Sequence, residues 1–296
     1  MGKLIGILVI IMLFGALDVS LAGNPFAAPT DARLLTDVQY GKAGATPLLL
    51  DLLLPKHYAG KKLPVVVWIH GGGWTQGTKS DNTAAWLAGH GHVVASIDYR
   101  LSGQAIFPAQ VHDCKAAVRF LRAHAKEYGI DSKRIGVWGI SAGGHLAALL
   151  GVSGGVKELE GRSGNRRYSS RVQAVCDFCG PVVLTLTDSR RVVPGAVEAL
   201  LGGPVKRNMD LARAASPTTY VSHGNAPTLI MSGEKDDLVP ISQSEIFYEA
   251  LKKAGVEATF VRLKGGHGFL GEMNDQGLQE TLRTVREFFD KWLTPT

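Results

Sequence analysis

Short apolar runs alternate with longer amphipathic segments along most of the chain. The apolar runs of strand length lie at 48–54, 63–70, 93–98, 135–139, 172–178, 227–232 and 258–263. Segments with helical spacing lie at 83–90, 109–128, 142–151, 241–254 and 276–293. Repeated strand–helix units of this kind produce a mostly parallel sheet with helices on both faces. The pattern therefore predicts an α/β fold.

Two of these elements show the pattern clearly. The run at 63–70 is rich in valine and almost wholly apolar, as expected for a strand that is covered on both faces. The segment at 109–128 places Val111, Val118 and Leu121 on one side of a helix. No internal repeat, low-complexity block or second domain boundary interrupts the pattern. Residues 23–296 are therefore expected to form one α/β domain.

The first 22 residues have the pattern of an export signal. One lysine precedes an unbroken apolar run at 4–17, and Ser20 and Ala22 are small residues at the positions that a signal peptidase requires. The run is shorter than the roughly 20 apolar residues of a membrane-spanning helix, and Asp18 follows it. We expect residues 1–22 to be removed on export to the periplasm or outside the cell, with an uncleaved anchor as the alternative.

The chain is basic, with a formal net charge of +6 and a pI near 9.2. Its basic residues are dispersed, except between Arg162 and Arg171, and few aromatic residues lie among them. This distribution favours a solvated basic surface over a nucleic-acid interface. Weak attraction to acidic polysaccharide or an anionic membrane surface remains open.

The chain has three cysteines, Cys114, Cys176 and Cys179. In an oxidising compartment, one disulfide and one free thiol is the simplest arrangement. Cys176 and Cys179 have C-x-x-C spacing, but the strand-like run at 172–179 does not favour a bridge between them. We expect buried structural thiols, or one bridge to Cys114. No histidine pair stands beside them at zinc spacing, so no metal or other cofactor is expected.

The clearest chemical motif is Gly139-Ile-Ser-Ala-Gly143, between an apolar strand and a small-residue helix. A G-x-S-x-G turn in this position exposes the hydroxyl of Ser141, and the helix directs free N–H groups, that of Ala142 first, towards it. The same pattern recurs at 151–155 around Ser153. That serine follows a helix instead of a strand and is expected to be a helix C-cap. Ser141 is therefore the predicted nucleophile.

A serine needs a base and an orienting acid. His267 lies between glycines directly after the last predicted strand, and Asp236 directly follows the preceding strand. Open α/β sheets place their sites at these carboxyl ends. The order Ser141, Asp236, His267 is typical of a G-x-S-x-G hydrolase. Asp237 is the competing acid, but Asp236 leaves Pro240 at the right spacing to begin the next helix.

The stretch His70-Gly-Gly-Gly-Trp74 follows the valine-rich strand. Its glycines leave backbone amides bare, and an acyl-transfer oxyanion needs such donors. We assign the oxyanion hole to Gly72, Gly73 and Ala142. Trp74 and Phe269 are candidates for lining the substrate pocket, with a role as core aromatics equally open.

These motifs, with Asp98-Tyr-Arg100, Phe107-Pro-Ala-Gln110 and Asp113, resemble the α/β-hydrolase fold. Within that fold the chain resembles the hormone-sensitive-lipase-like carboxylesterases, in particular the bacterial feruloyl-esterase-like (BD-FAE) branch with tryptophan after the glycines. The resemblance runs from about residue 37 to residue 292. It implies the same nucleophile, acid, base and oxyanion amides. It is weakest at 153–170 and 184–216, the segments expected to shape the substrate pocket.

The sequence thus predicts a serine ester hydrolase for short-chain or aryl esters, with feruloyl or acetyl groups on plant polysaccharide among its candidate substrates. An arylformamidase-like amide hydrolase is disfavoured by the export signal. A long-chain lipase is disfavoured by the charged residues within 184–216, and a dipeptidyl peptidase by the missing propeller. A non-catalytic polysaccharide-binding protein would have no use for the three catalytic residues. The oligomeric state stays open.

Overall fold

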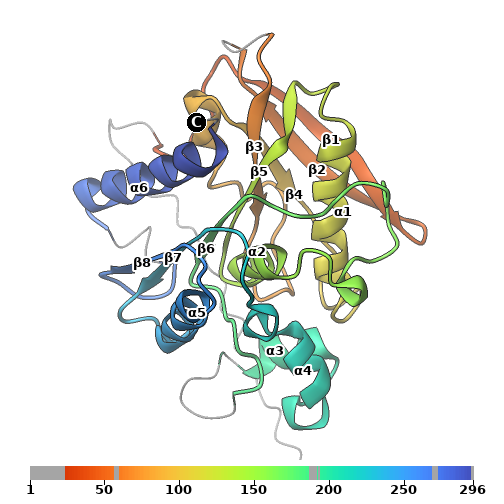
Figure 1. Cartoon of the computed structure of the whole chain (residues 1–296), viewed down its shortest axis with the longest axis vertical. Coiled ribbons are helices and arrows are strands. Elements are labelled where there is room, and N and C mark those ends of the chain that lie inside the picture. Colours follow the sequence, from red (N-terminus) through yellow and green to blue (C-terminus); the bar gives the residue numbers. More distant parts are fainter. Residues whose placement is uncertain (1–23, 57–59, 187–191, 193, 269–272, 295–296) are drawn as a thin grey trace, which may run out of the picture.

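The computed structural model describes residues 24–56, 60–186, 192, 194–268 and 273–294. The expected export signal and Phe269 lie outside these residues. The described residues form a sheet of eight strands in the order β1-β2-β4-β3-β5-β6-β7-β8 (Figure 1). The strands are β1 (Arg33–Ala43), β2 (Thr46–Leu54), β3 (Leu63–Ile69), β4 (Val93–Ile97), β5 (Ile130–Ile140), β6 (Ala174–Phe178), β7 (Thr228–Gly233) and β8 (Ala258–Leu263). Strand β2 is antiparallel to both of its neighbours, β1 and β4. The remaining strands, β4, β3, β5, β6, β7 and β8, are mutually parallel.

Helices cover both faces of this sheet. The helices are α1 (Ala109–Ala123), α2 (Ala142–Val152), α3 (Pro194–Leu201), α4 (Met209–Ala215), α5 (Ser242–Lys253) and α6 (Asp275–Leu293), with 3₁₀ turns η2 (Ala85–His90), η3 (Lys157–Leu159), η4 (Val205–Arg207) and η5 (Pro217–Tyr220). Helices α1, α2 and α5 pack on one face, and η2 and α6 pack on the other. This mixed, mostly parallel sheet confirms the expected α/β-hydrolase fold. None of the described helices is long and apolar enough to cross a membrane.

The elements with strong hydrophobic patterns lie where the sequence predicted them. All seven residues of β3 are buried, and β8 has the expected bounds. The segment at 83–90 differs, because it forms the 3₁₀ turn η2, which Gly91 ends with a left-handed φ of 82°. Strand β1 had no predicted counterpart. It lies at the edge of the sheet, where most of its residues stay partly or fully exposed and no apolar alternation arises.

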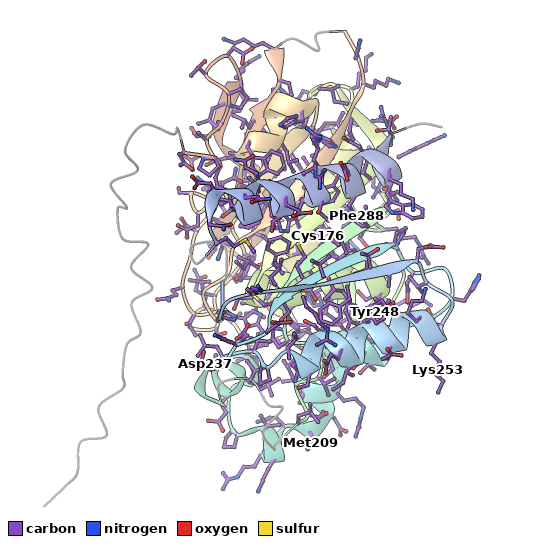
Figure 2. The ribbon with its side chains drawn as sticks, turned by 90° about the vertical axis from the view of Figure 1, so that its left-hand side faces the viewer. Cys176, Met209, Asp237, Tyr248, Lys253 and Phe288 are labelled. Carbon is purple, nitrogen blue, oxygen red and sulfur yellow. The ribbon has the colours of Figure 1, made fainter. Side chains whose placement is uncertain are left out.

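The three cysteines are buried and free, so the simplest arrangement with one disulfide is wrong and the alternative of buried thiols is confirmed. Cys114 belongs to the apolar cluster beneath α1. Cys176 belongs to the cluster on the opposite face, and Figure 2 shows it in the layer beneath α6. The sheet therefore separates these two thiols.

The two segments of weak family resemblance lie in different places. Helix α2 begins beside Ser141 and runs for 11 residues, about 16 Å, before the segment at 153–170 begins. That segment is held on α1 by Glu160, whose carboxylate contacts Lys115 at 2.8 Å and Arg119 at 3.0 Å. Helices α3 and α4 of the other segment lie together at the lower end of Figure 1. Helix α3 approaches the predicted site, because a Cβ at Gly73 would stand 3.4 Å from the Cβ atom of Ala196.

Candidate active site

Ser141 occupies a sharp corner between β5 and α2. Its backbone has φ 56° and ψ −120°, a region that costs a non-glycine residue on the order of 1–3 kcal/mol. The flanking glycines permit this corner. A Cβ at Gly139 would stand 2.2 Å from the carbonyl oxygen of Gly143, and a Cβ at Gly143 would stand 2.0 Å from that of Ile69. The motif thus folds as the sequence predicts, with the serine partly exposed at the strand end.

The structure brings Ser141, His267 and Asp236 together in one line of contacts. The Nε2 atom of His267 lies 2.9 Å from Ser141 Oγ, and its Nδ1 atom lies 2.8 Å from Asp236 Oδ2. The other carboxylate oxygen, Oδ1, accepts hydrogen bonds from the N–H groups of Leu238 at 3.0 Å and Val239 at 2.8 Å. These backbone donors fix the orientation of the carboxylate. With the ring proton on Nδ1, Nε2 is free to accept a proton from the hydroxyl.

The neighbouring carboxylate, Asp237, lies outside this line of contacts. The side chain of Asp236 is fully buried and that of His267 is 5% exposed, whereas Asp237 is exposed. Figure 2 shows Asp237 at the surface of the molecule. Asp236 is therefore the carboxylate within hydrogen-bond distance of His267.

The glycine loop after β3 lies beside the nucleophile. A Cβ at Gly71 would stand 3.5 Å from the Cβ atom of Ser141. Gly72 has φ 97°, and a Cβ there would stand 2.2 Å from the carbonyl oxygen of Gln76. Gly73 has φ 59°. Only glycine adopts this path without strain.

The amides assigned to the oxyanion hole are available as donors. Among the described residues, no acceptor is recorded for the N–H groups of Gly72 and Gly73. The N–H of Ala142 belongs to the first turn of α2, where no intrahelical acceptor exists. The structure therefore places three free backbone donors on elements that flank Ser141.

Trp74 lies in the core instead of facing the site. Its side chain is 1% exposed, and its Nε1–H donates to Nδ1 of His145 at 3.1 Å. His145 in turn donates from Nε2 to the carbonyl of Ala215 at 2.7 Å. Burial lowers the pKa of His145 to about 4, so its ring is neutral. These contacts fit the open alternative of a core aromatic and connect the glycine loop to α2 and α4.

Two residues near the site were missed by the sequence analysis. His145 stands four positions after Ser141, so one helical turn of α2 brings it beneath the nucleophile. Cys179 directly follows β6, as Asp236 and His267 follow the ends of β7 and β8. Cys179 thus has the same strand-end signal as the predicted acid and base, although its C-x-x-C spacing with Cys176 is more typical of disulfide chemistry.

Cys179 lies against the acid and the base. Its sulfur, a ring nitrogen of His267 and a carboxylate oxygen of Asp236 all lie within 4.8 Å of one another. Burial lowers the pKa of His267, but the neighbouring Cys179 and Asp236 outweigh this effect and raise the pKa above its usual value. This direction favours the imidazolium that forms when the ring takes a proton from a serine.

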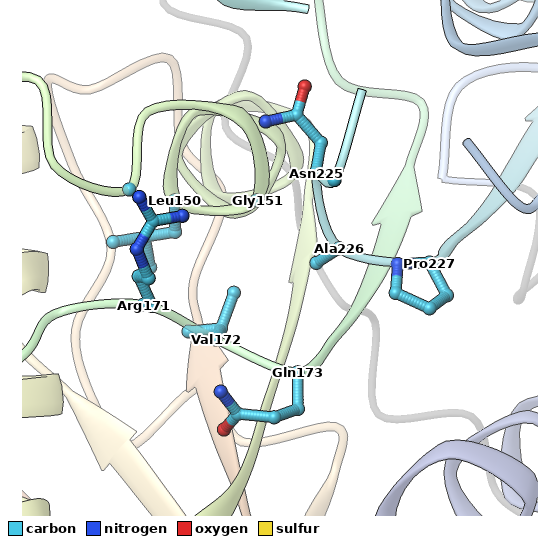
Figure 3. Close-up of a pocket in the computed structure, with 10 residues that line it drawn as sticks. Leu150, Gly151, Arg171, Val172, Gln173, Asn225, Ala226 and Pro227 are labelled. Carbon is cyan, nitrogen blue, oxygen red and sulfur yellow. The ribbon is translucent and has the colours of Figure 1, made fainter. Parts of the chain in front are cut away.

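A separate cavity of about 250 Å³, whose lining does not include Ser141, is shown in Figure 3. It is located where α2 ends and where β6 and β7 begin. This is the end of the parallel strands opposite to the end that carries Ser141. Arg171 is the charged residue that lines it. Two polar side chains in the lining, Gln173 and Asn225, already bond to the N–H of Ile135 and the carbonyl of Val152. This cavity therefore does not belong to the site around Ser141.

Comparisons with known proteins agree with the fold. Esterase LipQ of Mycobacterium tuberculosis is 31% identical over 242 residues, which cover 80% of this chain and 57% of LipQ. The chain thus spans little more than half the length of this curated relative. A truncated carbohydrate esterase from gut microbiota has 30% identity and a TM-score of 0.79, over 90% of this chain and 99% of that chain.

A third relative is esterase 2 of Thermogutta terrifontis. It has 29% identity and a TM-score of 0.75, over 90% of this chain and 95% of that chain. Structures of this esterase are known with propionate or butyrate bound and with the protein phosphorylated by paraoxon. Residues 50–251 of the present chain match the BD-FAE family. Because this match covers more than half of the sequence, the chain belongs to the BD-FAE family of α/β-hydrolases.

Proposed function

We propose that the protein is a serine carboxylesterase that hydrolyses short-chain or aryl esters through an acyl-enzyme. The observation that carries this proposal is the continuous contact from Ser141 through His267 to Asp236, at 2.9 Å and 2.8 Å. The three relatives named above are all esterases, which supports the same reaction class.

In the first step, Ser141 Oγ attacks the ester carbonyl while Nε2 of His267 takes the hydroxyl proton. Asp236 holds the ring and stabilises the imidazolium that forms. The N–H groups of Gly72, Gly73 and Ala142 stabilise the oxyanion, and losing one such donor typically raises the barrier by about 3 kcal/mol. The imidazolium then gives its proton to the departing alkoxide oxygen, so that the alcohol leaves and the acyl group stays on Ser141.

In the second step, water repeats this chemistry on the acyl-enzyme. His267 takes a proton from the water as its oxygen attacks the acyl carbon, and the proton passes to Ser141 Oγ as the carboxylic acid departs. The net reaction consumes one water for each ester. In this scheme, His267 carries each proton between Ser141, the leaving alcohol and the attacking water.

The substrate proposal is narrower than the reaction class. Propionate and butyrate bind to the Thermogutta terrifontis esterase, which favours short acyl groups here. Acetyl or feruloyl groups on plant polysaccharide form the second candidate. The similarity to a carbohydrate esterase favours it, as does the export signal proposed at 1–22. In that case the enzyme would act in the periplasm or outside the cell.

The first test is labelling with a fluorophosphonate followed by peptide mapping. We expect the label on Ser141, and we expect Ser141→Ala to lose both labelling and hydrolysis of p-nitrophenyl acetate. Ser153→Ala is the matched control, because Ser153 lies in a second G-x-S-x-G pattern but its hydroxyl is buried and donates to the carbonyl of Leu149 at 2.6 Å. Labelling at Ser153 would overturn the assignment.

Substrate panels then separate the remaining alternatives. Aryl acetates should be cleaved faster than the matching N-formyl arylamides, and the reverse preference would favour an arylformamidase. A folded protein that takes no label, cleaves no ester and still binds polysaccharide would favour the binding-protein alternative.

A further inference from the structure

A thiol, a carboxylate and an imidazole meet at the ends of three neighbouring strands. Cys179 follows β6, Asp236 follows β7 and His267 follows β8. One potential ligand atom from each lies within 4.8 Å of the other two. Cys179 and Asp236 are buried, and the side chain of His267 is 5% exposed. The residues that the structure describes contain no second group of this kind.

The chemistry of this group matches a thiophilic divalent cation. Zinc binds thiolate sulfur at about 2.3 Å and imidazole nitrogen or carboxylate oxygen at about 2.0–2.2 Å. Ligand atoms in a tetrahedral zinc site therefore lie roughly 3.5 Å apart. Since the observed separations do not exceed 4.8 Å, shifts of about 1 Å would bring the three atoms into range. Three protein ligands with one open position is a common arrangement around zinc.

We propose that Cys179, Asp236 and His267 form an inhibitory binding site for a thiophilic divalent cation such as Zn²⁺ or Cd²⁺. Binding releases the thiol proton to solvent and moves the ring proton of His267 from Nδ1 to Nε2, so that the Nδ1 lone pair binds the cation. The cation thereby replaces the hydrogen bond between His267 and Asp236. A ring held in this way does not carry protons between Ser141 and the substrate, so ester hydrolysis stops.

The thiolate ligand gives the site its selectivity for soft cations. Cys179 is held in place by the hydrogen bond from its N–H to the carbonyl of Met231, at 2.8 Å. The adjacent residue Phe178 accepts from the N–H of Ser141 at 2.7 Å. These bonds fix the backbone of Cys179 relative to β7 and to Ser141. Hard cations such as Mg²⁺ prefer oxygen ligands and should not bind here.

The decisive variant is Cys179→Ala, with Cys176→Ala as its matched control. Cys176 is a buried thiol within β6 that packs beneath α6 (Figure 2), and it does not belong to the group formed by Cys179, Asp236 and His267. Each protein is titrated with Zn²⁺ and Cd²⁺ in chelator-free buffer, and inhibition is expressed relative to its own metal-free rate. We expect Cys179→Ala to weaken inhibition at least about tenfold, since even changes to groups that only orient a ligand cost that much. Cys176→Ala should be inhibited like the wild type, and EDTA should restore activity.

A second readout does not depend on catalysis. Cd²⁺ is added to the Ser141→Ala protein, and the thiolate-to-cadmium absorption band in the ultraviolet is followed. We expect one Cd²⁺ per chain, and loss of the band in the Ser141→Ala, Cys179→Ala double variant. A band without any esterase activity in the wild type would contradict the proposed function but support the metal site.

Two results would overturn the metal site. One is undiminished inhibition and an intact cadmium band after removal of Cys179. The other is an equal loss of both signals in Cys176→Ala. Thermal unfolding checks that each variant is folded. If Cys179→Ala is not, Cys179→Ser replaces it, because a hydroxyl preserves the shape but is a poor ligand for Cd²⁺.

Discussion

The backbone conformation at Ser141 depends on two contacts that exclude any Cβ. Gly143 shows the constraint most directly, because its missing Cβ would stand 2.0 Å from a backbone oxygen of β3. No side-chain rearrangement can relieve a contact with a backbone atom. The glycines of G-x-S-x-G are therefore required by the packing of α2 against the sheet, and the turn at Ser141 depends on that same packing.

At this position we predict that Gly143→Ala destabilises the protein by more than about 3 kcal/mol or prevents folding, because α2 must move away from β3. The measurement is the free energy of unfolding in urea. Gly103→Ala is the control, since a Cβ at Gly103 has no atom within 4 Å. It should change stability by less than about 1 kcal/mol. Equal stability of the two variants would contradict the steric argument.

The acid can also be tested at the scale of one residue. Replacing Asp236 with asparagine keeps the shape but favours the wrong ring tautomer, and we predict that Asp236→Asn lowers kcat by about 10⁴-fold with little effect on KM. Asp237→Asn changes the adjacent, exposed carboxylate and should keep near wild-type kcat. A large loss in Asp237→Asn, with activity kept in Asp236→Asn, would reverse the assignment of the acid.

At the scale of elements, Glu160 holds the segment at 153–170 on α1. Its carboxylate contacts the Nζ atom of Lys115 and the guanidinium of Arg119, and the side chain of Lys115 is fully buried. Burial lowers the pKa of Lys115, and the carboxylate of Glu160 opposes this shift. The positive charge of Lys115 is therefore balanced by the carboxylate of Glu160, which lies 45 positions later in the chain.

We predict that Glu160→Gln destabilises the protein by about 3–5 kcal/mol, because it leaves a buried ammonium without its counter-charge. Glu280→Gln removes an exposed pair with Arg283 and should cost less than about 1 kcal/mol. Both are measured by urea unfolding. Adding Lys115→Met to Glu160→Gln should recover part of the loss. A double variant as unstable as Glu160→Gln would show that packing of the segment, and not charge, sets its stability.

The elements that the sequence predicts well are those whose burial leaves a clear hydrophobic pattern. Strands such as β3 are apolar because both faces are covered, and the ends of β7 and β8 could be located closely enough to identify Asp236 and His267. Strand β1 lacks such a pattern because it lies at the sheet edge. Cys179 also follows the end of a strand, so its place at the same end of the sheet could be predicted in the same way. Its distance from His267 depends on strand order, which places β6, β7 and β8 side by side and which no local pattern encodes.

At the scale of the whole molecule, one buried histidine connects three parts of the fold. His145 on α2 accepts from Trp74 of the glycine loop and donates to the last residue of α4. Burial lowers its pKa from 6.5 to about 4. The unfolded chain therefore binds a proton more readily than the folded protein. The contribution of His145 to stability is fully present above about pH 6.5 and is lost as the pH falls towards 4.

We predict that this single group makes the wild type lose about 2 kcal/mol of stability between about pH 7.5 and about pH 5, since each unit of pKa difference corresponds to roughly 1.4 kcal/mol. His145→Gln keeps a hydrogen-bonding group at the site but does not titrate. Its stability should be lower at neutral pH and should fall less on acidification. Urea unfolding of both proteins at the two pH values gives the difference of differences, in which other titrating groups largely cancel. If the two proteins lose the same free energy, the acid sensitivity of the fold comes from other groups, and His145 acts only through its packing.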